Sequence, residues 1–229
     1  MADPRSAPDL ITLTHPRSAA AEAYRTLRTS LDFSSLDQAI RSVVVTSAAP
    51  DEGKSTTLAN LAVTLAQAGR RTICVDADLR RPSLHRLFGL PNTAGLTTMM
   101  LDEAHLASPP LQAGPTPNLR ILTSGPLPPN PAELLAARRV DDVLERLRAD
   151  SDIVLFDAPP LIAVSDAAVL ATRVDGVILV VQAEKSRREH VQRAKTMLER
   201  VNARLIGAVL TNARLDGSVS YYGSEGDGG

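Results

Sequence analysis

The stretch "SVVVTSAAPDEGKSTT", residues 42–57, decides the fold. Its apolar run, residues 42–46, predicts a buried strand, and the residues that follow the stretch continue as a helix. Between them lies a loop that ends in Gly-Lys-Ser, residues 53–55, the close of the phosphate-binding pattern G-x-x-x-x-G-K-[ST]. Backbone N–H groups at a helix amino end can hold phosphates, so this order of elements predicts a nucleotide-binding site.

The loop departs from the pattern in two ways. Ala48 stands where the pattern has its first glycine, and Asp51 and Glu52 place two acids inside a loop that should hold anions. Asp tolerates a positive φ better than most residues, so Asp51 can keep the loop shape at a cost of about 1–2 kcal/mol. We expect its carboxylate to weaken nucleotide binding unless it points away from the phosphates.

The composition fits one α/β domain. The chain has 229 residues, of which 44% are hydrophobic and 22% charged, and this is enough for a sizeable core. The net charge of −1 argues against generic nucleic-acid binding. No apolar run approaches the length of about 20 residues that spans a bilayer, so we expect a cytoplasmic protein.

Apolar segments alternate with helical ones along the rest of the chain. The expected strands are residues 42–46, 71–78, 118–124, 152–160, 176–182 and 204–212. The expected helices are residues 19–33, 55–69, 132–149, 165–172 and 186–202. Near-continuously apolar strands that alternate with helices predict a parallel β-sheet covered on both faces, a three-layer α/β fold. We expect this domain over residues 19–213, between flexible segments at residues 1–18 and 214–229.

Acidic residues follow two of the expected strands. Asp76 and Asp78 follow the second strand, with Arg80 just beyond them, and Asp157 lies at the end of "IVLFD". Ligands of parallel sheets bind at the carboxyl ends of the strands, where these acids should meet the phosphate loop. One such acid commonly caps a turn, but three of them beside a phosphate loop favour a magnesium-nucleotide site.

These motifs resemble those of the bacterial tyrosine kinases of capsule and exopolysaccharide synthesis, P-loop nucleotidases of the deviant-Walker, MinD/ParA-like type. The resemblance covers roughly residues 18–213 and rests on "AAPDEGKSTT", "ICVDADLRRP", "VLFDAPP" and "EAYRTLR". It implies an autokinase that transfers phosphate from ATP to protein tyrosine, with Mg²⁺ as cofactor. The family has Pro-Gly-Glu-Gly-Lys where this chain has Asp51, so the resemblance puts the ATP affinity in question more than the fold.

The resemblance also implies roles for individual residues. The ATP-binding residues would be Ala49, Pro50, Asp51, Glu52, Gly53, Lys54, Ser55, Thr56 and, at the adenine, Asn212. The catalytic residues would be Lys54, Asp76, Asp78 and Asp157, and the metal-binding ones Ser55, Asp76 and Asp157. Arg80 would support the acceptor loop.

Two further motifs concern assembly and substrate. Glu22, Arg25 and Arg28 form a helical stripe that resembles the family's subunit-contact motif, and otherwise would be a solvated face with a Glu–Arg pair. Tyr221 and Tyr222 lie in the tail where the family carries a cluster of several phosphate-accepting tyrosines, and otherwise would be ordinary residues of a disordered end. The expected partners are further copies in a ring, a membrane-embedded co-polymerase that activates the kinase and recruits it to the inner face of the membrane, and a cognate tyrosine phosphatase.

Two other functions remain open from the sequence. A partitioning or site-placement ATPase of the ParA/MinD type has the same architecture, but it usually has a second lysine early in the phosphate loop, and residues 47–51 contain none. A regulator that binds nucleotide without catalysis is the other alternative, because Asp51 could impair the loop.

Overall fold

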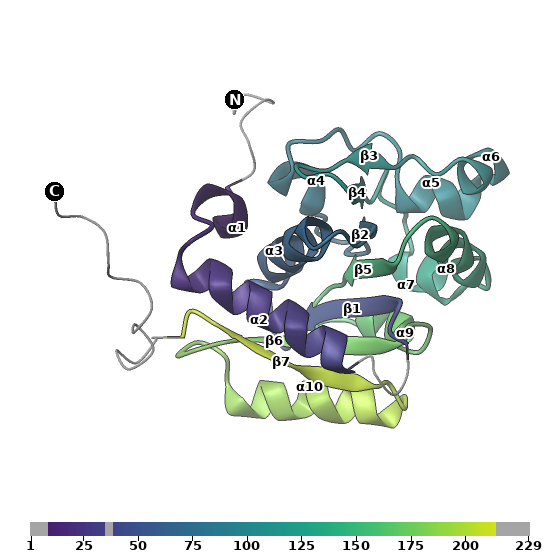
Figure 1. The fold of residues 1–229 in the computed structure, drawn as a ribbon. Coiled ribbons are helices and arrows are strands. Elements are labelled where there is room, and N and C mark those ends of the chain that lie inside the picture. The colour runs from purple at the N-terminus through teal and green to yellow at the C-terminus, as the bar shows by residue number, and fades with distance from the viewer. Residues whose placement is uncertain (1–8, 35–38, 214–229) are drawn as a thin grey trace, which may run out of the picture.

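The computed structural model of the protein describes residues 9–34 and 39–213 (Figure 1). Seven strands form one sheet in the order β3-β4-β2-β5-β1-β6-β7. The strands are β1 (Ser42–Ser47), β2 (Thr72–Asp76), β3 (Gln112–Ala113), β4 (Leu119–Leu122), β5 (Ile153–Asp157), β6 (Gly176–Gln182) and β7 (Leu205–Thr211). All neighbouring strands are parallel except β3, which pairs antiparallel with β4 at one edge. The predicted parallel sheet is confirmed.

Helices cover both faces of the sheet (Figure 1). The first group is α1 (Ile11–Thr14), α2 (Ala19–Ser34), α3 (Lys54–Gln67) and α4 (Leu84–Leu87). The second is α5 (Leu96–Leu101), α6 (Glu103–Ala107), α7 (Pro131–Ala136), α8 (Arg139–Ala149), α9 (Asp166–Ala171) and α10 (Arg188–Arg200). The three-layer arrangement is confirmed, and none of the helices in the described parts of the chain has the length and apolarity needed to cross a membrane.

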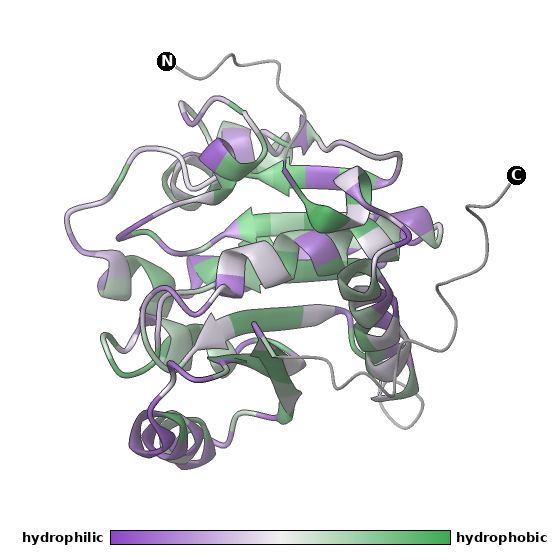
Figure 2. Ribbon diagram, turned by 90° about the vertical axis from the view of Figure 1, so that its left-hand side faces the viewer, coloured by the Kyte–Doolittle hydropathy of each residue, from purple (hydrophilic) through white to green (hydrophobic). Residues whose placement is uncertain are grey.

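The side chains of β1 show how the two layers form. Val43 and Val45 point into the core beneath α1–α4, whereas Val44 belongs to the core on the opposite face. Successive side chains of a strand point to opposite faces, and here both faces are buried, so the strand is apolar throughout. Figure 2 shows the resulting hydrophobic centre of the sheet with polar residues on the outer sides of the helices.

The segment before α2 is packed against the domain. Leu10 is fully buried, and Thr12 in α1 donates its hydroxyl to Asn60 Oδ1 in α3 over 2.8 Å. The expectation of a flexible segment up to residue 18 therefore does not hold for residues 10–14. Asn60 is a buried polar residue on an otherwise apolar helix, and α1 supplies the hydrogen bonds that its burial requires.

The region between β4 and β5 also differs from expectation. The helix predicted over residues 132–149 is broken at Ala137, whose backbone is extended (φ −63°, ψ 147°). The two pieces pack against different partners, since α7 contacts α9 and α8 packs over β5. No glycine marks the break, so tertiary packing sets it rather than helix propensity. A short strand, β3, forms within the segment 108–117 that was expected to be a loop.

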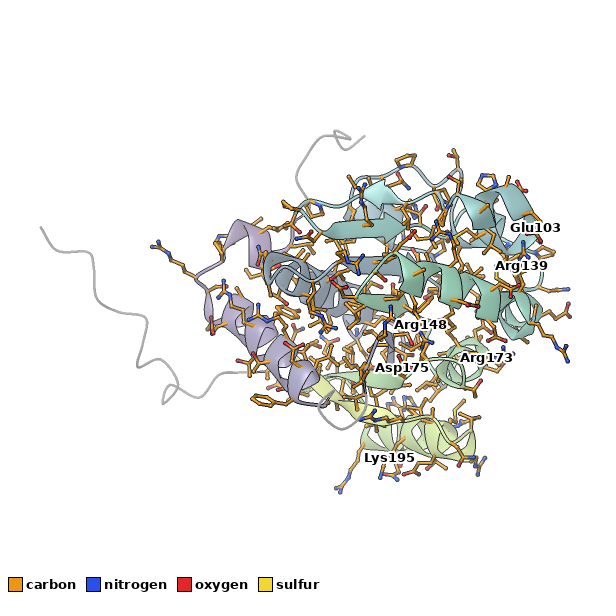
Figure 3. All side chains as sticks on the ribbon, turned by 45° about the vertical axis from the view of Figure 1, so that its right-hand side comes forward. Glu103, Arg139, Arg148, Arg173, Asp175 and Lys195 are labelled. Atoms are coloured by element: carbon orange, nitrogen blue, oxygen red, sulfur yellow. The ribbon has the colours of Figure 1, made fainter. Side chains whose placement is uncertain are left out.

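Ion pairs hold the amino ends of the central strands. Asp175, just before β6, accepts hydrogen bonds from the backbone N–H groups of Arg41 and Ser42, each over 2.8 Å, and pairs with Arg148 at 2.9 Å. Figure 3 labels Arg148 and Asp175 at this end of the sheet. The Asp175 carboxylate is thus held by two backbone N–H groups and by the Arg148 guanidinium, although Arg148 Nε itself is buried without a hydrogen-bond partner.

Candidate active site

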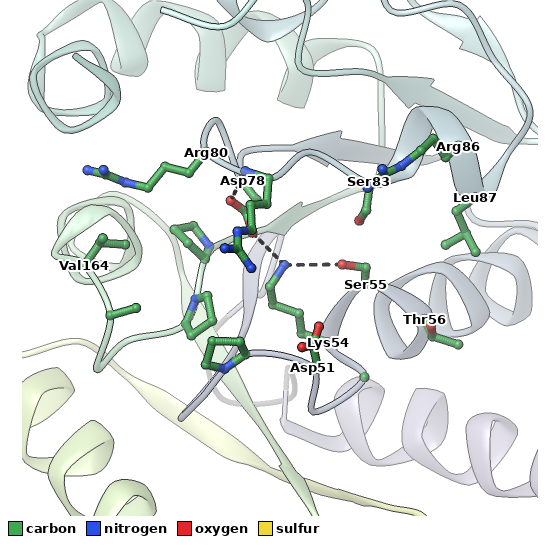
Figure 4. Close-up of a pocket in the computed structure, with 16 residues that line it drawn as sticks. Asp51, Lys54, Ser55, Thr56, Asp78, Arg80, Ser83, Arg86, Leu87 and Val164 are labelled. Carbon is green, nitrogen blue, oxygen red and sulfur yellow. Dashed lines mark hydrogen bonds and ion pairs between the residues drawn. The ribbon is translucent and has the colours of Figure 1, made fainter. Parts of the chain in front are cut away.

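A cleft of about 990 Å³ opens at the carboxyl ends of the strands (Figure 4). The lining residues are Pro50, Asp51, Gly53, Lys54, Ser55, Thr56, Asp78, Arg80, Arg81, Ser83, Arg86, Leu87, Pro159, Pro160, Ala163 and Val164. The phosphate loop and the segments after β2 and β5 thus meet there, as the topology of a parallel sheet predicts. The four catalytic candidates lie together at this site: Lys54 and Asp78 line the cleft, while Asp76 and Asp157 are buried beneath it.

The phosphate loop reaches α3 through left-handed residues. Gly53, the residue before the helix, has φ 88°, and Asp51 has φ 60°. Asp51 therefore does adopt the positive φ that Asp tolerates better than most residues. Its carboxylate lines the cleft, and its backbone carbonyl accepts a hydrogen bond from Lys185 Nζ over 2.8 Å. Lys185 thereby holds the strained turn from the neighbouring loop.

Lys54, the first residue of α3, is paired with two acids. Its Nζ lies 2.9 Å from Asp78 Oδ2 and 3.2 Å from Asp157 Oδ1, and Figure 4 draws its bond to Asp78. Burial lowers the pKa of Lys54, but the charges of Asp157 and Asp78 raise it by more, so the net pKa lies above the ordinary value. The ammonium group is thus held charged at the floor of the cleft.

Asp157, the last residue of β5, is fully buried. Its Oδ2 accepts a hydrogen bond from Ser55 Oγ over 2.5 Å, and Ser83 Oγ lies 3.5 Å away. Burial raises the pKa of Asp157 despite the opposing effect of Lys54. Asp157 therefore connects the hydroxyl that the sequence assigned to magnesium with the lysine assigned to phosphate.

Asp76, the last residue of β2, has one satisfied and one unsatisfied carboxylate oxygen. Its Oδ2 accepts hydrogen bonds from the N–H groups of Ser83 and Leu84 over 2.9 and 2.8 Å. Its Oδ1 is buried without a hydrogen-bond partner. Burial, followed by the charge of Asp157, raises the pKa of Asp76 to about 7. A buried, unpaired carboxylate oxygen is costly and points to a missing ligand.

The acids of the site fit a divalent cation. Asp76, Asp78 and Asp157 bring three carboxylates to the site, and Lys54 is the one cation that pairs with any of them among residues 9–34 and 39–213. No group of three or more His, Cys, Asp and Glu side chains gathers as a metal site in these same residues. Mg²⁺ normally takes one or two carboxylates and completes its shell with water and phosphate oxygens, so the arrangement suits Mg²⁺ bound together with a nucleotide.

Two of the loop residues that the sequence assigned to ATP binding, Ala49 and Glu52, lie outside the lining of the cleft. Glu52 is buried, and its carboxylate accepts hydrogen bonds from Ala49 N over 2.9 Å and from the Ser186 hydroxyl. Neither Glu52 nor Ala49 lines the cleft. The carboxylate of Glu52 closes the loop on itself and on the segment after β6, which explains how an acid is tolerated there. Ser186 and Lys185 were not anticipated, because their distance in sequence from the loop hides the contact.

Arg80 is held by a residue that the sequence did not single out. Its Nε and Nη2 lie 2.8 and 3.1 Å from the two carboxylate oxygens of Asp166, the first residue of α9, whose side chain is fully buried. This bidentate pair joins the segment after β2 to the segment after β5. "SDAAVLA" resembles an ordinary capped helix start, so only the fold reveals the partner.

Thr56 lines the cleft, whereas Asn212 does not. Asn212 is exposed with φ 52°, directly after β7. The preceding residue, Thr211, donates its hydroxyl to the Glu52 carbonyl over 3.0 Å, so the end of β7 lies against the phosphate loop. Asn212 is therefore next to the loop.

The assembly stripe has contacts within its own chain. Arg25 pairs with Glu22 at 2.6 Å and donates to the carbonyl of Pro16. Arg28 donates to the carbonyl of Thr64 over 3.2 Å. The tail tyrosines Tyr221 and Tyr222 and the expected flexible tail lie outside the described residues.

Comparison with known proteins agrees with this geometry. The family model described as "ParA: NUBPL iron-transfer P-loop NTPase" matches residues 38–215. "Tyrosine-protein kinase YwqD" of Bacillus subtilis is 42% identical over 219 residues, covering 95% of this chain and 92% of the relative. "Putative tyrosine-protein kinase CapB" of Staphylococcus aureus is 37% identical and covers 90% of each chain.

A solved structure agrees as well. The kinase domain of the Escherichia coli tyrosine kinase ETK superposes with a TM-score of 0.84 at 33% identity, covering 94% of this chain and 85% of that domain. Sequence and structure thus point to the same relatives over nearly the whole chain. The chain belongs to the bacterial tyrosine-protein kinases, within the ParA-type P-loop NTPases.

Proposed function

We propose that this chain is an ATP-dependent protein-tyrosine autokinase that controls the synthesis, length or export of a capsular or extracellular polysaccharide. The observation that carries the proposal is Lys54, held between Asp78 and Asp157 on the floor of a cleft where the phosphate loop meets the ends of β2 and β5. Membership of a kinase family supports the reaction, and the site supplies groups for each part of it.

The nucleotide side of the cleft is the phosphate loop. The N–H groups of residues 53–56 and the ammonium of Lys54 would hold the phosphates of ATP, and Thr56 would add a hydroxyl. Lys54 must exchange one of its acid partners for a phosphate when ATP binds. Asn212, next to the loop, is proposed to read the adenine edge. Ala49 and Glu52 are proposed to support the shape of the phosphate loop, and their side chains do not contact ATP in this proposal.

The metal side is Ser55, Asp157 and Asp76. These residues would hold Mg²⁺ directly or through water, and the unpartnered Oδ1 of Asp76 gives it an obvious ligand. Bound Mg²⁺ would neutralise charge that develops on the phosphate oxygens. Asp157 keeps the Ser55 hydroxyl in place through a 2.5 Å hydrogen bond.

Asp78 is proposed as the residue that receives the acceptor. It lines the cleft, whereas Asp76 is buried behind it. As the tyrosine oxygen bonds to the γ-phosphorus, the bond from that phosphorus to the ADP oxygen breaks, and Asp78 takes the hydroxyl proton. Phosphoryl transfer depends mainly on position and charge, so a weak base suffices.

The proposed acceptors are Tyr221 and Tyr222 of a neighbouring subunit in a ring. The stripe of Glu22, Arg25 and Arg28 would join the subunits, after exchange of its intrachain contacts for contacts with the next copy. A membrane-embedded co-polymerase would activate the ring and bring it to the inner face of the membrane, and a tyrosine phosphatase would reset it. No nucleic acid is expected as a partner.

The ATPase-switch alternative fits the same fold and the ParA-type family model, but the phosphate loop lacks a second lysine at residues 47–51, which counts against it. A mixing experiment tests the kinase. A Lys54→Met chain of altered mass is combined with a Tyr221→Phe/Tyr222→Phe chain, Mg²⁺ and ATP, and phosphotyrosine is mapped by mass spectrometry. We expect phosphate on the tail of the Lys54→Met chain. ATP hydrolysis without any phosphotyrosine, with or without a membrane partner, would contradict the proposal.

A further inference from the structure

The outer part of the cleft is formed by residues that the nucleotide site does not use. The segment after Asp78 places Arg80, Arg81 and Arg86 along the wall opposite the phosphate loop, and all three are exposed. In Figure 4, Arg80 extends toward Val164, while Arg86 lies beside Leu87 beyond Ser83. The wall thus combines basic groups with apolar ends.

Two of these arginines have no acidic partner among residues 9–34 and 39–213. Arg80 is neutralised by the buried carboxylate of Asp166. Arg86 donates to the carbonyl of Pro82 over 3.1 Å, and neither Arg86 nor Arg81 forms an ion pair with the part of the chain that the structure describes. Two guanidinium charges on this wall are therefore available to a ligand.

The position of this wall indicates which ligand it serves. The phosphate loop and Lys54 are the groups proposed to bind the nucleotide. In the amino-acid sequence, Asp78 lies between them and the three arginines. Asp78, Arg81 and Arg86 line the same cleft, so an acceptor segment whose tyrosine reaches Asp78 can lay its flanking residues over this wall. Guanidinium groups match carboxylates in charge and in hydrogen-bond geometry.

The chain's own tail has the complementary charge. The tail, residues 214–229, contains Asp216, Glu225 and Asp227 and a single basic residue, Arg214. Glu225 follows Tyr222 by three residues, a span of at most roughly 10 Å in an extended chain. A carboxylate is thus available close to each acceptor hydroxyl.

We propose that Arg81 and Arg86 form a subsite that binds carboxylates flanking the acceptor tyrosine, and so select acidic tyrosine segments as substrates. The proposal rests on the kinase function proposed above. The bound segment is extended, with its tyrosine at Asp78 and its acids on the two guanidinium groups. Leu87 and Val164 limit the groove at its ends.

Peptide binding to the full chain tests the subsite without requiring catalysis. A fluorescein-labelled peptide of residues 215–229 is compared by anisotropy with its neutral version, Asp216→Asn/Glu225→Gln/Asp227→Asn. We expect the acidic peptide to bind roughly fivefold more tightly, as two partly exposed charge pairs allow. An Arg81→Gln/Arg86→Gln chain should lose this preference.

A charge-matched control separates the subsite from general attraction. Arg188→Gln/Arg193→Gln removes two arginines from α10, away from the cleft, and should leave the preference intact. Equal binding of the two peptides, an equal loss in the α10 variant, or a loss of Mg-ATP affinity in the Arg81→Gln/Arg86→Gln chain would overturn the subsite.

The same peptides also report on the kinase function separately. Transfer of phosphate to the acidic peptide by the wild-type chain, measured with Mg-ATP, tests the reaction. If the wild-type chain prefers the acidic peptide but phosphorylates neither, the subsite stands and the kinase proposal fails. If it binds and phosphorylates both peptides equally, the kinase proposal stands and the subsite fails.

Discussion

The two ends of the sheet treat charge in opposite ways. At the amino ends of the strands, Asp152 pairs with Arg71 at 2.6 Å, and this hydrogen bond holds the pKa of Asp152 below its ordinary value. At the carboxyl ends, burial raises the pKa of Asp76 and Asp157 above theirs. Carboxylates therefore support the folded state at one end, whereas at the other they are kept at a cost in stability.

The opposite pKa shifts at the two ends indicate which end of the sheet binds a ligand. Both ends have the same backbone geometry and draw on the same residue types, so the fold alone does not require the crowded acids. Groups whose charged forms are disfavoured in the free protein mark a site that a cation and a nucleotide complete. At the amino end, by contrast, Asp152 and Asp175 are each paired with an arginine.

Loss of the Lys54 ammonium group should have the largest effect on kinase activity. Lys54→Met should lower tyrosine phosphorylation by at least about 100-fold, because preorganised charge at the transferred group is lost. Arg148→Met removes a partly buried cation from the amino end and should leave the initial rate within about twofold. The rates are measured by phosphotyrosine blot in chains shown to be folded by circular dichroism. A comparable loss of rate in both variants would remove the distinction between the ends.

One arginine–carboxylate pair at each end of the sheet allows the two ends to be compared by the free energy of unfolding. Arg80→Leu leaves the fully buried Asp166 without its bidentate partner and should lower the free energy of unfolding by about 1–3 kcal/mol. Arg71→Leu removes a similar guanidinium from Asp152, whose side chain is 40% exposed, and should lower the free energy of unfolding by less than Arg80→Leu does. Urea unfolding measures both values. An equal cost would mean that the depth of the carboxylate does not matter here.

Left-handed residues at the two ends give the smallest expected effect. Asp51→Gly should strengthen Mg-ATP binding roughly two- to fivefold, because it removes an exposed carboxylate from the cleft. Asn118→Gly is the control, since Asn118 also has a positive φ (65°) but lies before β4 at the amino end. Calorimetric titration should show no change in affinity for Asn118→Gly. Unchanged or weaker binding by Asp51→Gly would assign the Asp51 carboxylate a use of its own.

The sequence was sufficient to predict the sheet, the phosphate loop and the three acids beside it. Alternating apolar strands and helices determine a parallel sheet, and the carboxyl ends of its strands must then gather Lys54, Asp76 and Asp157. These features depend on local pattern and on one topological rule. The sequence raised the left-handed conformation of Asp51 only as a condition, and the fold supplies it.

Contacts between distant segments could not be predicted. Asp166 lies 86 residues from Arg80, and Ser186 lies 134 residues from Glu52, so nothing in the local pattern connects them. The break at Ala137 depends on the separate packing of α7 and α8, which helix propensity does not encode. The basic wall of the cleft likewise required the fold, since the sequence alone suggested an acidic site.

The carboxyl end of the sheet loses folding stability by keeping its buried acids ionised. This loss is measured most directly at Asp76. Its folded pKa of about 7 exceeds the ordinary 3.8, so the folded chain binds more protons than the unfolded chain between these values. The stability contributed by this group is therefore full below pH 4 and falls as the pH rises toward 7. The penalty should be complete above pH 7.

Thermal unfolding of ligand-free Asp76→Asn and Asp175→Asn chains is the decisive measurement. At pH 7.5 the Asp76→Asn chain should melt several degrees above wild type. The substitution removes a buried charge, while the amide oxygen of Asn still accepts hydrogen bonds from the N–H groups of Ser83 and Leu84. This gain should shrink as the pH is lowered to 4. Asp175→Asn should melt below wild type at pH 7.5, because it loses the carboxylate that pairs with Arg148 at the amino end. A lower melting temperature for Asp76→Asn at pH 7.5 would contradict the account.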